Sequence, residues 1–167
     1  MIDKVTSEQR SKMMSAVKGK NTKLELLVRK LLYSKGYRYR LHVKSLPGKP
    51  DIVISRLKIA IFCNGCFWHK HDCDLFKWPQ TKTEFWKEKI NGNASRDFNN
   101  WKELMQNQWK VVVVWGCTMK GKLKLTPGEL SEKLTEAINS SVTKSKKLLC
   151  LLIRLDMYSM PMFQKEC

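Results

Sequence analysis

The chain is organised around the stretch Phe62-Cys63-Asn64-Gly65-Cys66-Phe67-Trp68-His69-Lys70-His71-Asp72-Cys73-Asp74-Leu75-Phe76-Lys77-Trp78. This stretch holds three of the six cysteines and two of the three histidines of the protein. Thiolate and imidazole groups are the usual protein ligands of zinc, and such a dense cluster of them indicates a metal site. The stretch is therefore predicted to be a loop that a metal ion holds in place.

The sequence offers a full set of ligands for a tetrahedral zinc ion. The four residues are Cys66, His71, Cys73 and Cys117. Three thiolates and one imidazole form a common zinc set, and four protein ligands leave no position open for water, which indicates a structural role. Spacing alone leaves the set open, because Cys63 forms a Cys-x-x-Cys pair with Cys66, and His69 competes with His71.

Composition indicates one domain with a polyanionic partner. A chain of 167 residues, 43% of them hydrophobic, is long enough to bury one core. The net charge of +17 and the pI near 9.8 indicate a nucleic acid as the partner. No apolar segment follows Met1, and the apolar run at residues 148–153 is too short to span a membrane. We therefore expect a cytoplasmic protein with reduced cysteines and no membrane partner.

Hydrophobic periodicity predicts an α/β fold. Helices are expected after capping boxes at residues 22–25 and 81–84 and after a cap at residues 126–129. Strands are expected at residues 37–44, 51–54, 57–62 and 111–115. The first strand alternates apolar with basic residues, and the last is apolar throughout, which is typical of a central strand. This order of elements fits one mixed sheet with helices on both faces.

Two acidic residues and one histidine are candidates for catalysis. Asp51 stands at the entry of an apolar strand, where a carboxylate beside a basic surface would bind magnesium; it equally fits a turn after Pro50. Glu25 fits the capping box with Thr22, but it also flanks the apolar stripe of its helix and could lean toward the sheet. His69 is a candidate general base, because the pKa of histidine lies near the operating pH.

Phe67 and Trp68 lie in the metal loop and follow no helix or strand pattern. Aromatic side chains on a braced loop of a basic protein are suited to wedge between base steps or to stack on bases. The alternative is that both rings form a small satellite core around the metal. The sequence leaves these two interpretations open.

Several motifs spread over about residues 6 to 138 occur together in one known family. They are Arg10-Ser11-Lys12 with Met14, Thr22-x-x-Glu25, Leu46-Pro47-Gly48-Lys49-Pro50-Asp51, Gly65-Cys66-Phe67-Trp68-His69, Arg96-Asp97, and Trp109-x-Val111 through Trp115-Gly116-Cys117. With this combination the chain resembles the very short patch repair (Vsr) endonucleases, bacterial enzymes that nick DNA beside thymine-guanine mismatches. The resemblance implies a restriction-endonuclease-like three-layer core, with a mixed sheet flanked by helices and a structural zinc site.

The resemblance also implies roles for single residues. Asp51 would hold magnesium together with the backbone carbonyl of Cys63, and His69 would activate the attacking water. Glu25 would support a water bound to the magnesium. The structural zinc ligands would be Cys66, His71, Cys73 and Cys117.

Five further residues would contact DNA if the resemblance holds. Phe67 and Trp68 would wedge into the duplex beside the mismatch, and Met14 would approach from the other groove. Lys89 and Asn93 would read the displaced wobble pair, which agrees with their shared face on the helix expected after residue 84.

The implied function is a magnesium-dependent endonuclease that nicks one strand of duplex DNA next to a T:G mismatch and so starts very short patch repair. Mismatched double-stranded DNA is the expected partner, with mismatch-repair proteins as further partners of a monomer associated with the nucleoid. Residues 1–20 are interpreted as an arm or helix that contacts DNA, and residues 21–140 as the nuclease domain with its zinc loop at 63–78. Residues 141–167 are interpreted as an extension without a clear pattern.

Two alternatives to a nuclease follow from the same sequence. Asn64 stands where the best-known Vsr enzymes carry a histidine, so a zinc-containing protein that binds mismatched or duplex DNA without cutting it is the first alternative. An RNA-binding protein is the second, since basic charge and exposed aromatic residues also suit RNA. Magnesium-dependent nicking of mismatched duplex distinguishes the nuclease from both.

Overall fold

The computed structural model of the chain describes residues 6, 8, 9, 12, 15, 19–140 and 149–151. Met14, which the resemblance places in a DNA groove, lies outside the described residues. Most of the predicted arm at residues 1–20 and of the predicted extension at 141–167 lies outside them as well. The interpretations of these two segments therefore stay predictions.

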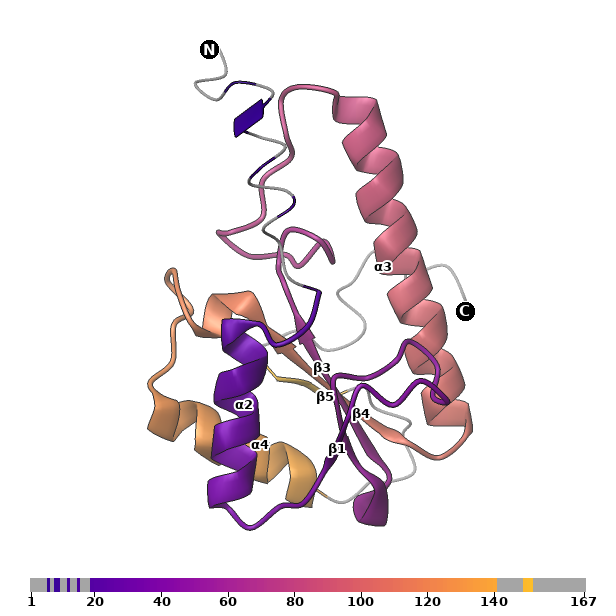
Figure 1. Cartoon of the computed structure of the whole chain (residues 1–167), viewed down its shortest axis with the longest axis vertical. Coiled ribbons are helices and arrows are strands. Elements are labelled where there is room, and N and C mark those ends of the chain that lie inside the picture. The colour runs from indigo at the N-terminus through magenta and orange to yellow at the C-terminus, as the bar shows by residue number, and fades with distance from the viewer. Residues whose placement is uncertain are drawn as a thin grey trace.

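The described strands form one mixed sheet in the order β1-β2-β3-β4-β5 (Figure 1). They are β1 (Arg40–Leu41), β2 (Ile52–Ile54), β3 (Ile59–Asn64), β4 (Lys110–Trp115) and β5 (Leu149–Leu151). The strand β2 runs antiparallel to both of its neighbours, β1 and β3. The strand β4 runs parallel to β3 and to β5. The predicted mixed sheet is thus confirmed.

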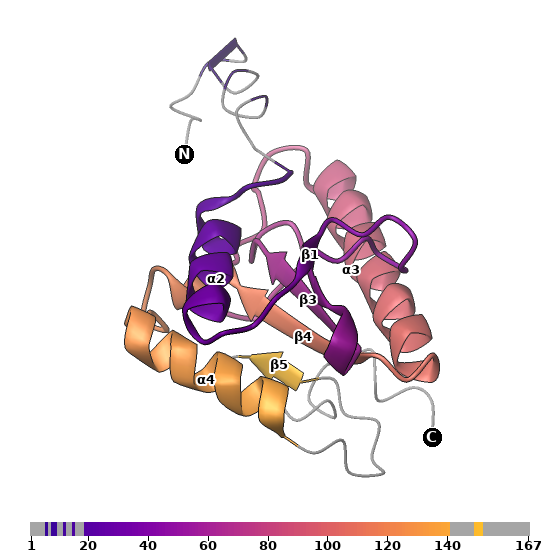
Figure 2. The same ribbon diagram turned by 60° about the horizontal axis from the view of Figure 1, so that its bottom comes forward.

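Helices cover both faces of this sheet. The helices α2 (Lys23–Ser34) and α4 (Pro127–Asn139) lie on one face, and α3 (Thr83–Gln106) lies on the other (Figure 2). The first half of α3 extends beyond the sheet and runs beside the loop that follows β3 (Figure 1). None of the helices that the structure describes is long and apolar enough to cross a membrane. The predicted α/β class is confirmed.

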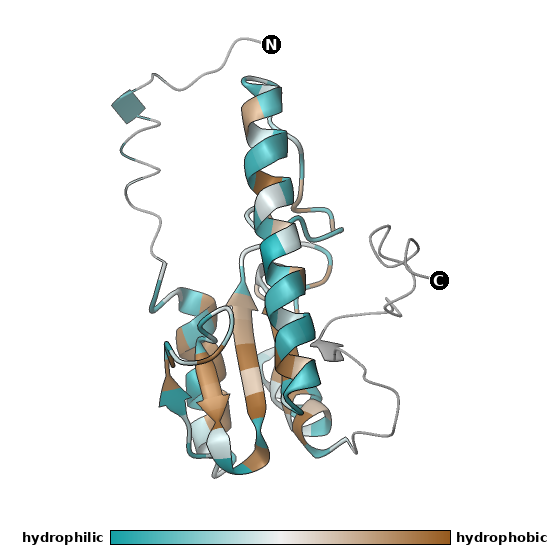
Figure 3. Cartoon of the chain, turned by 90° about the vertical axis from the view of Figure 1, so that its right-hand side faces the viewer, coloured by the Kyte–Doolittle hydropathy of each residue, from teal (hydrophilic) through white to brown (hydrophobic). Residues whose placement is uncertain are grey.

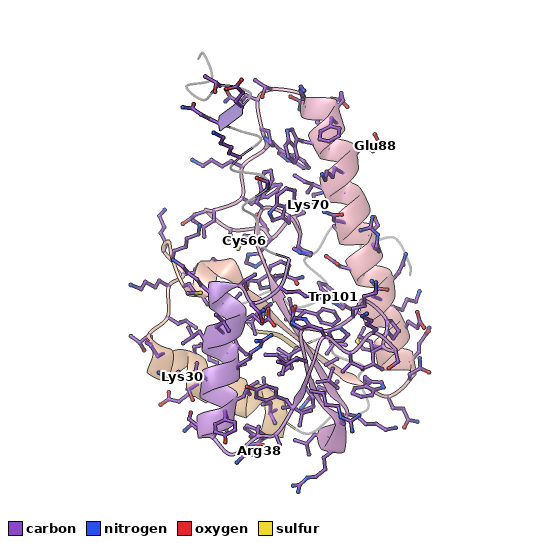
Figure 4. All side chains as sticks on the ribbon, viewed as in Figure 1. Lys30, Arg38, Cys66, Lys70, Glu88 and Trp101 are labelled. Carbon is purple, nitrogen blue, oxygen red and sulfur yellow. The ribbon has the colours of Figure 1, made fainter. Side chains whose placement is uncertain are left out.

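The strands β3 and β4 are apolar because both of their faces are buried (Figure 3). On the side of α2 and α4 the sheet contributes Ile52, Ile54, Ile59, Ile61, Val112 and Val114. On the side of α3 it contributes Ala60, Phe62, Val111, Val113 and Trp115. Trp101 of α3 packs into this second core, where its ring meets that of Phe62 at 6.1 Å between centroids (Figure 4). The two cores fix the sheet between its helices.

Two of the three predicted helix starts are confirmed. The hydroxyl of Thr22 accepts a hydrogen bond from the backbone N–H of Glu25 at 3.2 Å and so caps α2. Thr126 and Glu129 form a complete capping box at the start of α4. The predicted end of α2 near Gly36 is confirmed too, because this glycine has the left-handed φ of 85° that terminates many helices.

The capping box predicted at residues 81–84 is wrong. The helix α3 begins at Thr83, and Lys82 precedes it with a left-handed φ of 50° and no capping side chain. The hydroxyl of Thr83 instead donates to the carbonyl oxygens of Pro79 and Gln80, at 3.3 and 3.4 Å. The left-handed turn at Lys82 therefore leaves Thr81 outside the helix.

The strand predicted at residues 37–44 is much shorter than expected. The strand β1 has only two residues, both exposed, so the predicted division into one buried and one basic face is wrong. Tyr37 and Tyr39 are half-buried and pack against the first core before the strand begins. His42 ends β1 because its backbone is left-handed, with a φ of 49°.

The end of the described chain adds one element that the sequence did not indicate. The strand β5 pairs with β4 through Leu149, Cys150 and Leu151, inside the segment that was predicted to be an extension without a pattern. Its position beside β4 explains why β4 is apolar throughout, since β4 is a central strand with a parallel neighbour on each side.

Candidate active site and metal centre

The predicted zinc ligands come together at one end of the sheet. The ligand atoms of Cys66, His71, Cys73 and Cys117 all lie within 4.8 Å of one another. Cys66 follows β3, and Cys117 lies in the 3-10 helix η2 (Gly116–Thr118) that follows β4 (Figure 4). Because β3 and β4 are parallel neighbours, their carboxyl ends meet at the same edge of the sheet. The parallel pairing thus brings the distant fourth residue to the loop.

Contacts inside this group show how closely it is packed. The backbone N–H of Cys117 donates to the sulfur of Cys66 at 3.2 Å, and the sulfur of Cys117 lies 3.5 Å from Nδ1 of His71. The ring of His71 stacks on Trp115, with 4.2 Å between centroids. The two residues that left the set open in the sequence, Cys63 and His69, are not part of the group. Three sulfurs and one imidazole nitrogen fit a tetrahedral metal ion.

The protonation of the thiols is consistent with a cation at this position. The hydrogen bond from the thiol of Cys117 lowers the pKa of Cys66 to about 4 and raises the pKa of Cys117. Burial raises the pKa of Cys73. The negative charge of Cys66 also raises the pKa of Cys73 and of Cys117. A divalent metal would stabilise the remaining thiolates as ligands.

A cavity of about 600 Å³ opens beside this metal loop. It is lined by Gly19, Thr22, Gly48, Lys49, Asp51, Phe62, Cys63, Asn64, Gly65, Trp68, His69 and Asp97. Asp51 and His69, which the sequence predicted as a magnesium ligand and a general base, are thus brought to one cavity. Its walls come from the loop before β2, the end of β3, the metal loop and α3.

Asp51 is held at the cavity by two backbone contacts. Its Oδ2 accepts a hydrogen bond from the backbone N–H of Cys63 at 2.8 Å, and its carbonyl oxygen accepts one from His42 at 3.1 Å. Burial raises the pKa of Asp51, the hydrogen bond from Cys63 opposes this, and the nearby charge of Glu25 adds to it. A cation close to the carboxylate would relieve both unfavourable effects.

Glu25 does more than cap its helix. Its side chain is 1% exposed, and Oε2 accepts a hydrogen bond from the backbone N–H of Asn21 at 2.7 Å, one residue earlier than a capping box requires. Its Oε1 forms an ion pair with Arg29 and lies 3.1 Å from Nε2 of His42. The ligand atoms of Glu25, His42 and Asp51 lie within 4.8 Å of one another. The side chain of Glu25 therefore leans toward the sheet, which is the second of the two roles predicted for it beside the capping box.

His69 is oriented by an acidic residue of α3. Its Nδ1 lies 2.5 Å from Oδ2 of Asp97, and both side chains are largely buried, with 28% and 21% exposed. A carboxylate accepts hydrogen bonds, so Nδ1 of His69 donates a hydrogen bond to Asp97. This orients the ring and leaves Nε2 as the nitrogen that can act on a substrate.

Sequence reasoning missed three residues of this site. Asp97, His42 and Arg29 all contact predicted site residues, yet none of them was assigned a role. Asp97 did stand in one of the motifs of the resemblance. His42 is the third histidine of the chain, and its position near the end of an expected strand was the only signal for it.

Asn64 also lines the cavity. It is 5% exposed, and its amide nitrogen has no hydrogen-bond partner among the described residues. A buried amide without a partner is uncommon, and it is found more often where a site is completed by a ligand or water.

Phe67 and Trp68 belong to an aromatic cluster between the metal loop and α3. The cluster consists of Phe67, Trp68, Phe76, Trp78, Phe85 and Trp86. Phe67 contacts Trp68 and Trp86 edge to face, at 5.2 and 5.5 Å between centroids. Both rings are half-buried. Phe67 contacts Phe76 of the metal loop as well as Trp86 of α3, and Trp68 contacts Trp86. The two interpretations of these rings, a wedge into DNA or a satellite core, both stay predictions.

Lys89 and Asn93 lie against the same rings. The amine of Lys89 is 5.6 Å from the centroid of Trp68, and the amide of Asn93 donates to the carbonyl oxygen of Trp68 at 3.1 Å. Four of the five residues predicted to contact DNA are therefore neighbours, at the end of the molecule where α3 extends beyond the sheet (Figure 1).

Comparison with known proteins places this site in a family. The family model described as DNA mismatch endonuclease Vsr matches residues 2–75. The DNA mismatch endonuclease Vsr of Escherichia coli (strain K12) is 44% identical over 136 residues, which cover 81% of this chain and 85% of the relative. The chain belongs to the Vsr family. The predicted resemblance is thereby confirmed.

Other relatives of this Vsr chain are named as nicking enzymes. The type II nicking enzyme V.NmeAIP of Neisseria meningitidis serogroup A is 46% identical over 122 residues, covering 73% of this chain and 87% of the relative. The type II nicking enzyme V.XorIIP of Xanthomonas oryzae pv. oryzae is 43% identical over 119 residues, covering 71% and 88%. The prediction of an endonuclease is confirmed by these names.

Proposed function

We propose that this Vsr-family endonuclease nicks one strand of duplex DNA next to a T:G mismatch by magnesium-dependent hydrolysis of the phosphodiester. One observation carries the proposal: Asp51 and His69 line a single cavity. A cation ligand and a general base can then act on the same phosphate. A cavity of about 600 Å³ is large enough to admit a phosphodiester with its attacking water.

His69 acts as the general base in this proposal. Asp97 holds the proton on Nδ1, so Nε2 accepts a proton from the attacking water. The water oxygen forms a bond to phosphorus while the bond from phosphorus to the 3′ oxygen breaks, which leaves a 5′-phosphate at the nick. Asp97 also stabilises the positive charge that the ring acquires in this step.

Asp51 and the backbone carbonyl of Cys63 would hold magnesium, as the resemblance implies. Their oxygen donors fit a hard cation, and positive charge beside the carboxylate of Asp51 would oppose the effect of burial that raises its pKa. When bound, magnesium supplies positive charge to the phosphate and to the leaving oxygen. Glu25, whose carboxylate lies beside that of Asp51, would orient water at this side of the cavity.

Zinc is the metal proposed for Cys66, His71, Cys73 and Cys117. Their sulfur and nitrogen atoms are the donors that zinc prefers, and four of them complete its coordination. Its proposed role is to hold the metal loop on the ends of β3 and β4. This loop carries His69, Phe67 and Trp68, so the zinc would set their positions at the cavity.

Mismatch recognition is assigned to the aromatic cluster and its polar neighbours. Insertion of Phe67 and Trp68 between base pairs would cost a few kcal/mol of unstacking, and least at a weakly paired wobble. Lys89 and Asn93 are close enough to Trp68 to read the base pair that it displaces. Met14 is proposed to enter the opposite groove.

The remaining proposals concern the whole protein. The layer order supports a restriction-endonuclease-like core within a nuclease domain at residues 21–140, flanked by a DNA-contacting arm and an extension. We further propose that the enzyme is a cytoplasmic monomer that works at the nucleoid with mismatch-repair proteins.

The proposal is tested by nicking of an end-labelled T:G duplex. Wild-type protein with magnesium should yield one nick with a 5′-phosphate, and neither matched duplex nor D51A should give it. Wild-type activity in D51A would overturn the proposed mechanism. Tight binding to the T:G duplex without any nick would favour the non-catalytic alternative, in which Asn64 stands in place of the histidine of the best-known Vsr enzymes. Tighter binding to RNA than to the T:G duplex would favour the RNA-binding alternative.

A further inference from the structure

His42 is the one described histidine without a role in the proposed function, although it lies inside the site. Its Nε2 is 3.1 Å from Oε1 of Glu25, and its Nδ1 is 3.9 Å from Oδ1 of Asp51. The ring therefore stands between the two carboxylates. Its side chain is 22% exposed, so most of the ring is enclosed by its neighbours.

The contact with Glu25 fixes that carboxylate. Nε2 of His42 lies 3.1 Å from Oε1 of Glu25 and 3.0 Å from Nη2 of Arg29, whose guanidinium can only donate. Arg29 also binds Oε1, so the His42 ring packs against the ion pair between Arg29 and Glu25. The other oxygen of Glu25 accepts the N–H of Asn21. Glu25 is thus held from three sides in a buried position.

The contact with Asp51 is of a different kind. Its Oδ2 is bound by the backbone N–H of Cys63, which turns Oδ1 toward the ring of His42. The 3.9 Å between Nδ1 and Oδ1 is too long for a hydrogen bond. The ring therefore sets the distance between Asp51 and Glu25 without occupying Oδ1, which stays available to a cation.

The backbone conformation of His42 also supports the position of its ring. Its φ of 49° is a left-handed conformation that residues other than glycine, asparagine and aspartate seldom adopt. Its N–H donates to the carbonyl oxygen of Asp51 at 3.1 Å. Uncommon backbone conformations persist where the surrounding structure requires them, and they concentrate at functional sites.

We propose that His42 is a positioning residue for the divalent cation, because its ring holds the carboxylates of Glu25 and Asp51 at the spacing that the cation requires. This inference rests on the proposed function, in which Asp51 binds the cation. It adds a residue that binds neither the zinc group nor DNA. Groups that orient metal ligands typically change the affinity for the metal by 10-fold to 100-fold when they are removed.

The test compares H42G with H42N. Glycine and asparagine both accept a left-handed backbone, so neither variant strains the chain at position 42. H42G removes the ring, and we expect it to weaken binding of Mg²⁺ and Mn²⁺ to the full-length protein by roughly 10-fold to 100-fold, measured by titration calorimetry without DNA. H42N keeps a polar group there and should recover part of that loss.

Two further measurements separate positioning from a general loss of structure. The magnesium concentration for half-maximal nicking should rise in H42G by the same factor, whereas affinity for the T:G duplex without magnesium should stay at the wild-type value. Q108G is the matched control, because Gln108 has a left-handed φ of 63° in an exposed position after α3. Q108G should leave cation affinity unchanged.

Wild-type cation affinity in H42G would overturn the proposal, and so would an equal loss in Q108G. The calorimetric experiment does not depend on catalysis. If wild-type protein bound the cation more tightly than H42G but failed to nick the T:G duplex, the proposed function would fail while this inference stood. If wild-type protein nicked and H42G matched it in cation affinity, the inference alone would fail.

Discussion

Replacing Lys49 by asparagine should weaken DNA binding through the loss of one positive charge. Lys49 is exposed, lines the cavity two residues before Asp51, and has a left-handed φ of 51°. Asparagine adopts this conformation more readily than lysine, so K49N removes the charge without straining the loop. The loop lies close against α3, because a Cβ on Gly48 would approach that of Asn100 to 3.0 Å. Lys49 thus projects from a backbone that is fixed in place.

The size of the effect follows from counterion release. Each phosphate that a protein neutralises on duplex DNA contributes about 0.9 to the slope of log K against log salt. Loss of one such contact should reduce the slope by about 0.9 and weaken binding roughly 8-fold at 0.1 M salt, with a smaller factor at higher salt. Fluorescence anisotropy with a T:G duplex, in magnesium-free buffer at several NaCl concentrations, measures both quantities.

K58N provides the control for this prediction. Lys58 is exposed and has a left-handed φ of 49°, but it precedes β3, whereas the cavity lies at the other end of that strand. Both variants lose one charge and gain the same backbone preference, so they differ only in position. K58N should keep the wild-type affinity and slope. Equal losses in K58N and K49N would refute the reasoning, because the position of Lys49 at the cavity would then be irrelevant.

Three other predictions concern the base, the zinc site and the pH dependence. D97N should lower kcat on the order of 10²-fold without changing the Kd for DNA, because His69 loses the acceptor that keeps its proton on Nδ1; an unchanged single-turnover rate would contradict this. C117S should lose its zinc, measured by atomic absorption, and its Tm should fall by roughly 10 °C, since several kcal/mol of binding energy is removed and each 1 kcal/mol shifts Tm by about 2–4 °C; full zinc occupancy would exclude Cys117 as a ligand. Burial raises the pKa of Asp51 in the folded state above its ordinary value of 3.8. Between the ordinary pKa and the raised pKa the folded state binds more protons than the unfolded state, so the free energy of unfolding rises as the pH falls through that window. Without magnesium, D51N should therefore be more stable than wild type at pH 7, and urea unfolding should show this difference shrinking toward pH 4; a constant difference would argue against the raised pKa.

The centre of the fold was predictable from sequence because its signals are local. The strands β2, β3 and β4 are short apolar runs, which is the pattern of buried strands. The caps at the starts of α2 and α4 are short sequence motifs. The wrong predictions concern β1 and the start of α3, whose bounds depend on backbone conformations that the sequence does not reveal. His42 and Lys82 both adopt left-handed backbones, which shortens β1 and delays the start of α3.

The site was predictable where residue chemistry alone was decisive. Cysteines and histidines at metal spacing indicated a metal-binding group, and the parallel pairing of β3 with β4 brings its distant member, Cys117, to the loop. The partners of these residues were not predictable in the same way. Asp97 meets His69 across 28 positions of the chain, and His42 meets Glu25 only because β1 ends beside α2. Such pairs arise from tertiary packing, which no local pattern encodes.

The group formed by Cys66, His71, Cys73 and Cys117 has a consequence for how the protein is made. His71 and Cys117 are 46 positions apart, so a ribosome that has just released the loop has not yet synthesised its last ligand. The nascent loop must wait until β4 is translated and docked before its coordination shell can close. A fragment that stops before Cys117 would carry Asp51 and His69 but would lack the fourth member of this group. Such a fragment is therefore expected to leave the loop without its link to the end of β4.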